Sequence, residues 1–151
     1  MHSHSFAHLD IAVRNVLTDY AGRYAYIDYE TSRRFPKPPA EGGDIRNHSV
    51  LIYQPRGAEI PPEVENGHST SPYAMDVWAL GKLISKAGAL TGYDAPELCL
   101  LTRQMLEPRW ESRPSAKMVL SRFEDAVLNI SQERLNSAPR SLCPTLPAIS
   151  S

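Results

Sequence analysis

The strongest restriction on the fold comes from a stretch between Ser71 and Gly92 that is apolar on nearly every side of a helix. Ser71 and Pro72 supply a cap and a first-turn proline, and Gly88 and Gly92 are the expected stop signals. A helix that is apolar around most of its circumference has to be covered by other elements. We therefore predict a deeply buried helix. Its apolar positions are Met75, Val77, Trp78, Leu80, Leu83, Ile84 and Ala87.

Two further helices are predicted after it. The first runs from about residue 95 to 106, with Asp94 as N-cap and Glu97 completing a capping box. Its periodic apolar residues are Leu98, Leu101, Met105 and Leu106. The second runs from about residue 115 to 129. The residues expected to face inward are Met118, Val119, Leu120, Phe123, Val127 and Leu128.

Short strands and irregular segments surround this helical part. Residues 15–18 and 24–29 are apolar segments separated by a turn-like sequence, which predicts a β-hairpin. Residues 33–67 are rich in Pro, Gly and charge, which is typical of a functional or disordered segment. Residues 131–151 are Ser/Pro-rich, and we expect a disordered tail. The predicted class is mainly α with a short hairpin (α+β), in one domain over residues 1–130.

Composition restricts the environment and the partners. With 42% hydrophobic residues and a net charge of −1, the chain has no basic field to recruit nucleic acid or an anionic membrane. Cys99 and Cys143 are far apart, which indicates no disulfide framework and favours a cytoplasmic or nuclear location. His2, His4 and His8 lie close together without acidic or Cys companions, so no metal site is predicted from them.

The first motif that carries chemistry is the run His8-Leu9-Asp10-Ile11-Ala12-Val13-Arg14-Asn15. Its spacing of His, Asp and Asn, leading into an apolar strand, resembles the catalytic loop of protein kinases. The resemblance implies that Asp10 orients an attacking hydroxyl and accepts its proton, and that Asn15 binds a Mg²⁺ ion that bridges the phosphates. Related small-molecule phosphotransferases carry the same spacing, so the motif alone leaves that class open.

A second motif follows at the end of the hairpin, in Tyr26-Ile27-Asp28-Tyr29-Glu30. It resembles the D-F-G motif of the same family, which implies that Asp28 holds the principal Mg²⁺. Tyr29 then replaces the Phe that packs against His8. Leu17 matches the position beneath the adenine ring of ATP, and an ordinary strand residue in the core is the equally good alternative.

Two more motifs resemble structural parts of a kinase C-terminal lobe. The sequence Ile60-Pro61-Pro62-Glu63-Val64 stands in the place of A-P-E, and the family pattern pairs Glu63 with Arg113 of an Arg-Pro-Ser sequence. Asp76 begins a sequence similar to D-x-W-x-x-G, whose Asp hydrogen-bonds the backbone of the catalytic loop. The resemblance therefore assigns structural roles to Glu63, Asp76 and Arg113.

The chain also departs from the family pattern. Leu9 replaces the Arg that binds an activating phosphate, so regulation by phosphorylation of this segment is not expected. Glu30 replaces a Gly, which restricts the backbone of the metal-binding loop. Ala12 and Arg14 resemble tyrosine kinases, but the segment before Pro61 fits neither the tyrosine nor the serine/threonine class. The type of substrate hydroxyl therefore stays open. The substrate-docking helix that the family has after the buried helix is expected to be deleted or reduced here, after residue 92.

The resemblance covers residues 1–129 and only the C-terminal lobe. The sequence contains no Gly-rich loop and no V-A-I-K lysine to hold the phosphates of ATP. The implied function is phosphoryl transfer from Mg-ATP to a protein hydroxyl, and we expect this chain to be inactive by itself. The alternatives are a pseudokinase-like interaction module and a small-molecule phosphotransferase of related fold. The Pro-Pro-Glu, D-x-W-x-x-G and Arg-Pro features argue against the latter.

Overall fold

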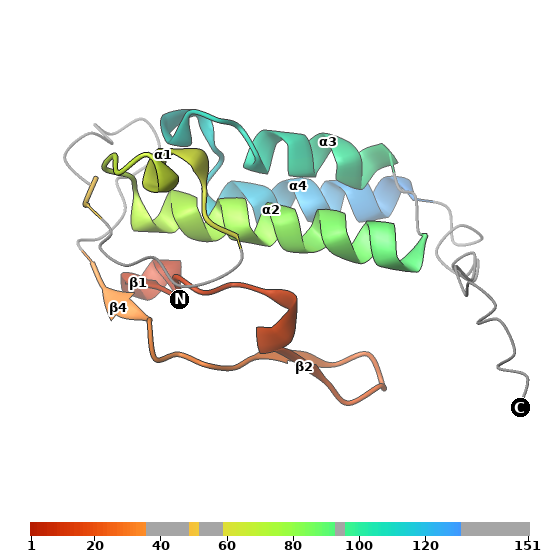
Figure 1. Ribbon diagram of the computed structural model, residues 1–151. Coiled ribbons are helices and arrows are strands. Elements are labelled where there is room, and N and C mark those ends of the chain that lie inside the picture. Colours follow the sequence, from red (N-terminus) through yellow and green to blue (C-terminus); the bar gives the residue numbers. More distant parts are fainter. Residues whose placement is uncertain (36–48, 52–58, 93–95, 131–151) are drawn as a thin grey trace, which may run out of the picture.

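A computed structural model describes residues 1–35, 49–51, 59–92 and 96–130. Helices α2 (Pro72–Thr91), α3 (Pro96–Met105) and α4 (Ala116–Asn129) lie side by side, and the N-terminal strands lie beneath α2 (Figure 1). The described residues also form two short antiparallel strand pairs, so the predicted α+β class is confirmed. In these ranges no helix has both the length and the apolar character needed to cross a bilayer.

Helix α2 begins and ends with the signals that the sequence predicted, apart from Gly88. The Ser71 hydroxyl accepts a hydrogen bond from the Ala74 amide, and Gly92 ends the helix in a left-handed conformation with φ of 66°. The helix continues through Gly88. Its first half is buried, but its second half is largely exposed, and Leu90 is 72% accessible. The prediction of deep burial is therefore wrong for the second half, because the packed neighbours of α2 cover mainly its first turns.

Helix α3 contacts both α2 and α4. A core cluster joins the three helices through Val77, Leu101, Met105 and Val119. Gly81 allows the close approach of α2 to α3, because a Cβ atom at this position would lie 3.0 Å from the Cβ of Met105. The predicted inward positions of α3 are confirmed, since Leu101 and Met105 are buried and Leu98 and Leu106 partly so. The predicted cap Asp94 lies outside the described residues.

The Ser115 hydroxyl caps α4 by accepting a hydrogen bond from the Met118 amide. Three of the residues predicted to face inward are exposed: Leu120 by 57%, Phe123 by 41% and Leu128 by 84%. The prediction is wrong for them because the buried stripe of α4 is narrow. It is centred on Val119, which packs against α3 together with Ala116.

The N-terminal part contains the predicted hairpin. Strand β2 (Val16–Thr18) pairs with β3 (Tyr24–Tyr26), and Val16 lies opposite Tyr26. The second strand is shorter than predicted and ends before Ile27. A second pair, β1 (Phe6–Ala7) with β4 (Arg33–Arg34), is too short to be recognised from sequence alternation. Short 3-10 turns at His2–His4 (η1) and Val13–Asn15 (η2) precede β1 and β2.

A second core cluster attaches this N-terminal part to the helices. It consists of Ala7, Leu9, Val64, Tyr73 and Met75, with Phe35 and Ile60 packed against it. Val64 comes from the short helix α1 (Pro62–Glu65), and a further 3-10 turn (η4, Trp110–Ser112) precedes α4. The segment that carries His8 and Asp10 is therefore fixed between β4, α1 and α2. The predicted disordered tail, residues 131–151, lies outside the described residues.

Candidate functional site

Asp76 of α2 holds the backbone of the 8–10 segment. One carboxylate oxygen accepts a hydrogen bond from the Leu9 amide at 2.8 Å, and the other accepts from the His8 amide at 2.8 Å. The His2 Nε2 donates to the same second oxygen, also at 2.8 Å. Because Asp76 is only 3% exposed, these bonds are poorly accessible to competing water. The contact expected between Asp76 and the loop backbone is present.

The Asp76 contacts stabilise an unfavourable backbone conformation at Leu9. Its φ of 65° lies in the left-handed region, which costs a non-glycine residue about 1–3 kcal/mol. Each hydrogen bond to the buried carboxylate contributes about 1.5–3 kcal/mol, so the two amide contacts offset that cost. The turn at Leu9 in turn directs the next side chain, Asp10, toward the loop that ends at Asn15.

Asp10 and Asn15 are brought into direct contact. The Asn15 Nδ2 donates to the Asp10 backbone oxygen at 2.9 Å and to its Oδ2 at 3.0 Å. The Arg14 guanidinium donates to the Asp10 Oδ1 at 2.5 Å. Asp10 and Asn15 are 8% and 4% exposed, whereas the Arg14 side chain is 49% exposed. Because the two acceptors of Asp10 fix the amide nitrogen of Asn15, the amide oxygen of Asn15 remains an acceptor for another group.

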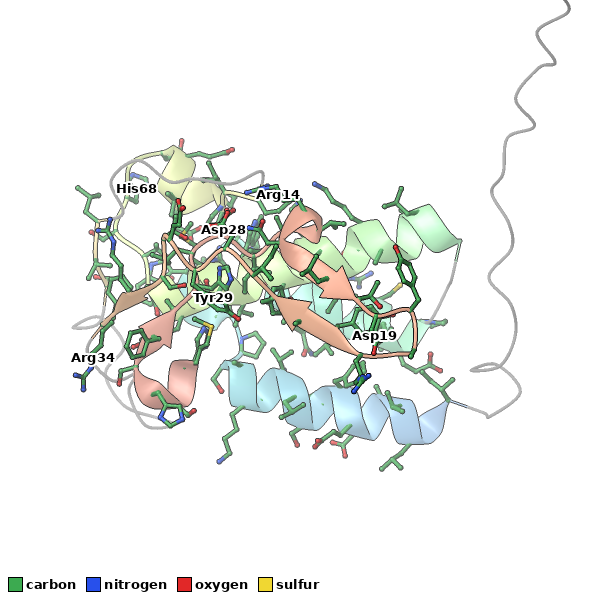
Figure 2. All side chains as sticks on the ribbon, turned by 90° about the horizontal axis from the view of Figure 1, so that it is seen from below. Arg14, Asp19, Asp28, Tyr29, Arg34 and His68 are labelled. Atoms are coloured by element: carbon green, nitrogen blue, oxygen red, sulfur yellow. The ribbon has the colours of Figure 1, made fainter. Side chains whose placement is uncertain are left out.

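Asp28 lies next to Asn15 through the hairpin backbone. The Ile27 amide donates to the Asn15 backbone oxygen at 3.0 Å, directly before Asp28. Asp28 itself has a φ of 62°, and its side chain is exposed. Figure 2 shows Asp28 near Arg14 and Tyr29, while Asp19 lies at the far end of the hairpin. Glu30, two residues further, is also exposed, so two carboxylates face solvent on this loop.

His8 is buried against tyrosine rings. Its ring centroid lies 5.0 Å from that of Tyr29 and 5.7 Å from that of Tyr26, so the expected His8–Tyr29 contact is present. The His8 Nδ1 accepts a hydrogen bond from the Asp10 amide at 3.3 Å, which leaves the proton on Nε2, a buried atom without a hydrogen-bond partner in the described ranges. Burial raises the pKa of the Tyr26 phenol, and the negative charge of Asp76 adds to the shift. Leu17 on β2 is 54% exposed.

Glu63 and Arg113 form a buried ion pair with two parallel hydrogen bonds, each 2.7 Å long. Arg113 also donates to the backbone oxygens of Glu107 and Pro108, and its guanidinium lies 4.7 Å from the Trp78 ring centroid. The pairing expected for these two residues is present. It joins α1 to the segment before α4, across 50 residues of sequence, and lies in the helical framework.

Three contacts of the site were not foreseen from the sequence. The His2–Asp76 bond spans 74 residues and has no local signal. The Arg14–Asp10 pair joins residues four apart in sequence, but the segment is not an α-helix, so the i,i+4 rule did not predict it. Glu59 lies beside Asp10 and Asp76 around a cavity of about 10 Å³, which has room for about one water molecule. No sequence motif pointed to Glu59.

In the described ranges, no three His, Cys, Asp or Glu side chains converge as a metal-binding group. The donors proposed for a cation are a single carboxylate and an amide oxygen. No protein-family model matches the chain, and no curated protein sequence matches it.

Proposed function

We propose that residues 1–130 form the C-terminal lobe of a protein-kinase-like domain and that Asp10, Asn15 and Asp28 constitute its phosphoryl-transfer site. The observation that carries the proposal is the position of the Asn15 side chain. Its amide nitrogen is bound by the Asp10 backbone and carboxylate, so its oxygen is available beside the loop of Asp28. Such an arrangement supplies a proton acceptor and two oxygen ligands from adjacent segments.

The donor set suits Mg²⁺, which prefers carboxylate and carbonyl oxygens together with substrate phosphates and several waters. Asp28 and Asn15 would hold the ion, and the bound ion would neutralise charge on the phosphate oxygens. Leu17, exposed on β2, would contact the adenine ring of ATP. Because a Mg²⁺ site of this kind needs only one or two protein ligands, a set of Asp28 and Asn15 is sufficient.

The protein's own contribution to catalysis would come mainly from Asp10. Its carboxylate would orient the attacking hydroxyl of a protein substrate and accept its proton. Arg14 now donates to one oxygen of this carboxylate, and the hydroxyl requires access to an oxygen. Since the Arg14 side chain is half exposed, it can move away from Asp10 without leaving a cavity in the core.

A melting experiment on the full chain tests the proposal. A ligand that binds only the folded form, at about ten times its dissociation constant, raises the melting temperature by about 3–6 °C for a chain of this size. We expect such a shift with Mg-ATP and a smaller one with ATP and EDTA. Asp28→Asn should remove the dependence on Mg²⁺, whereas Glu124→Gln on the exposed face of α4 should keep it.

Two results would contradict the proposal. A melting temperature unchanged by millimolar Mg-ATP would exclude nucleotide binding by this chain. A Mg²⁺-dependent shift that survives in Asp28→Asn would exclude the metal role of Asp28.

One observation favours the alternative of an interaction module without catalysis. Both carboxylate oxygens of Asp10 already have donors within the protein, from Arg14 and Asn15. A lobe used only for binding would keep these contacts permanently. Under this alternative, Arg14→Ala lowers the stability of the fold and leaves nucleotide binding absent.

A further inference from the structure

Glu59 is a nearly buried carboxylate at the edge of the proposed site. Its side chain is 9% exposed, and its ion partner is Lys86 of α2, whose side chain is 52% exposed. Glu59 lies in sequence just before α1 and lines the same small cavity as Asp10 and Asp76. A cationic side chain from another part of the molecule therefore reaches a carboxylate that lies beside the proposed proton acceptor.

The three carboxylates around this cavity differ in how they are compensated. Asp76 receives three hydrogen bonds, two of them from backbone amides that cannot leave. Asp10 is bound by Arg14 and by Asn15, which is buried. Among the residues that the structure describes, Glu59 is bound by the ammonium of Lys86 and by no other side chain. A buried carboxylate requires a cation or donors. If its cation moves away, Asp10 keeps the Asn15 amide and Asp76 keeps two backbone amides, whereas Glu59 loses Lys86.

We propose that Glu59 selects protein substrates that carry a basic residue directly beside the hydroxyl-bearing residue, and that Lys86 occupies this cationic position when no substrate is bound. The inference rests on the proposed function, because it takes Asp10 as the group that meets the hydroxyl. Because Asp10 and Glu59 line the same small cavity, a peptide with its hydroxyl at Asp10 has its neighbouring residue close to Glu59. Arginine should be preferred to lysine, since its planar fork binds a carboxylate through two hydrogen bonds.

The test uses the full chain and a fluorescein-labelled peptide with one central serine between alanines. The residues that flank the serine are arginine, norleucine or glutamate in three otherwise identical peptides, and binding is measured by fluorescence anisotropy. We expect the arginine peptide to bind about twofold to fivefold more tightly than the norleucine peptide, in the range of one accessible ion pair. The glutamate peptide should bind most weakly.

Two substitutions change this preference in opposite directions. Glu59→Gln should abolish the difference between the arginine and norleucine peptides. Lys86→Met should enlarge it, because the internal competitor is gone. Glu65→Gln on α1 and Lys117→Met on α4 change exposed residues of the same charge and serve as matched controls that leave the preference unchanged. Melting curves identify any variant that fails to fold. If Glu59→Gln fails to fold, the peptide preference of Lys86→Met still tests the inference.

The inference is overturned if wild type and Lys86→Met bind the three peptides equally, including no binding at all, or if Glu59→Gln folds and retains the preference. Melting temperatures measured with and without Mg-ATP on the same samples show whether the proposed function fails as well. A nucleotide shift without an arginine preference removes only the role of Glu59. An arginine preference without a nucleotide shift keeps the role of Glu59 in peptide binding and removes the phosphoryl-transfer assignment.

Discussion

The Glu63–Arg113 pair and the Asp28 loop each contain a carboxylate. The two carboxylates differ in burial and in the hydrogen bonds that they accept. Glu63 is nearly buried, has two hydrogen bonds from a fully buried guanidinium and receives another from the Thr70 hydroxyl. Asp28 is exposed in a left-handed backbone conformation, and in the described ranges no hydrogen bond or ion pair holds its carboxylate. The buried Glu63–Arg113 pair is suited to holding elements together. The exposed Asp28 carboxylate is suited to binding a ligand from solvent.

The two carboxylates differ in what they require from the surrounding protein. A buried charge must be compensated internally, because the cost of an unpaired buried ion is several kcal/mol. An exposed carboxylate is solvated, so its lack of a partner costs little and leaves it available to a ligand. Substitutions in the two regions should therefore affect different measurements.

The largest expected effect follows from breaking the buried pair. Arg113→Met leaves Glu63 buried without its cation and should lower the free energy of unfolding by about 3–5 kcal/mol. Arg113 also contacts the oxygens of Glu107 and Pro108, so the loop before α4 loses its anchor. Urea denaturation followed by circular dichroism measures the change, and Arg109→Met, at an exposed position, is the matched control. A loss below about 1 kcal/mol, the range of exposed pairs, would remove the distinction between the two regions.

An intermediate effect is expected at Asp76, which connects the helical framework to the site. Asp76→Asn keeps the shape but replaces one accepting oxygen by an amide that repels the donors it meets. We expect a loss of about 2–3 kcal/mol and faster hydrogen exchange at the His8 and Leu9 amides. Glu124→Gln serves as the control. Unchanged protection of these two amides would show that the loop conformation does not depend on Asp76.

Helix positions were predictable because their signals are local. Periodicity identified α2 and α4 within a few residues, and the cap Ser71 of α2 was predicted as well. The exposure of Leu120 and Leu128 was not predictable, because the width of a buried stripe depends on which neighbours cover the helix. The helix's own sequence does not contain that information.

Contacts between residues far apart in sequence were predictable only where a family motif indicated them. The Glu63–Arg113 pair was expected only through resemblance to kinase motifs, since 50 residues separate its partners. The His2–Asp76 bond and the position of Glu59 beside Asp10 had no comparable pattern and were missed. The strand pair β1–β4 was missed because two residues are too few to show an alternation.

The smallest expected effect lies at the tip of the hairpin, in the exposed region. The Asp19 carboxylate accepts hydrogen bonds from the Arg23 side chain and from the Ala21 and Arg23 amides, and these contacts hold its pKa below the usual value of 3.8. A carboxyl group whose pKa is lower in the folded state stabilises that state above pH 3.8. The contribution disappears as the pH falls through the lowered pKa.

Amide hydrogen exchange and NMR shifts of Ala21 and Arg23 should therefore report loosening of the turn as the pH falls through the lowered pKa of Asp19. Asp19→Asn should keep part of the turn and remove this dependence on pH, since an amide does not titrate. Glu30→Gln, on the other exposed loop, should leave the titration of the turn unchanged. If Asp19→Asn lowered the melting temperature as much as Arg113→Met, the hairpin tip would belong to the stability framework and the separation of the two regions would not hold.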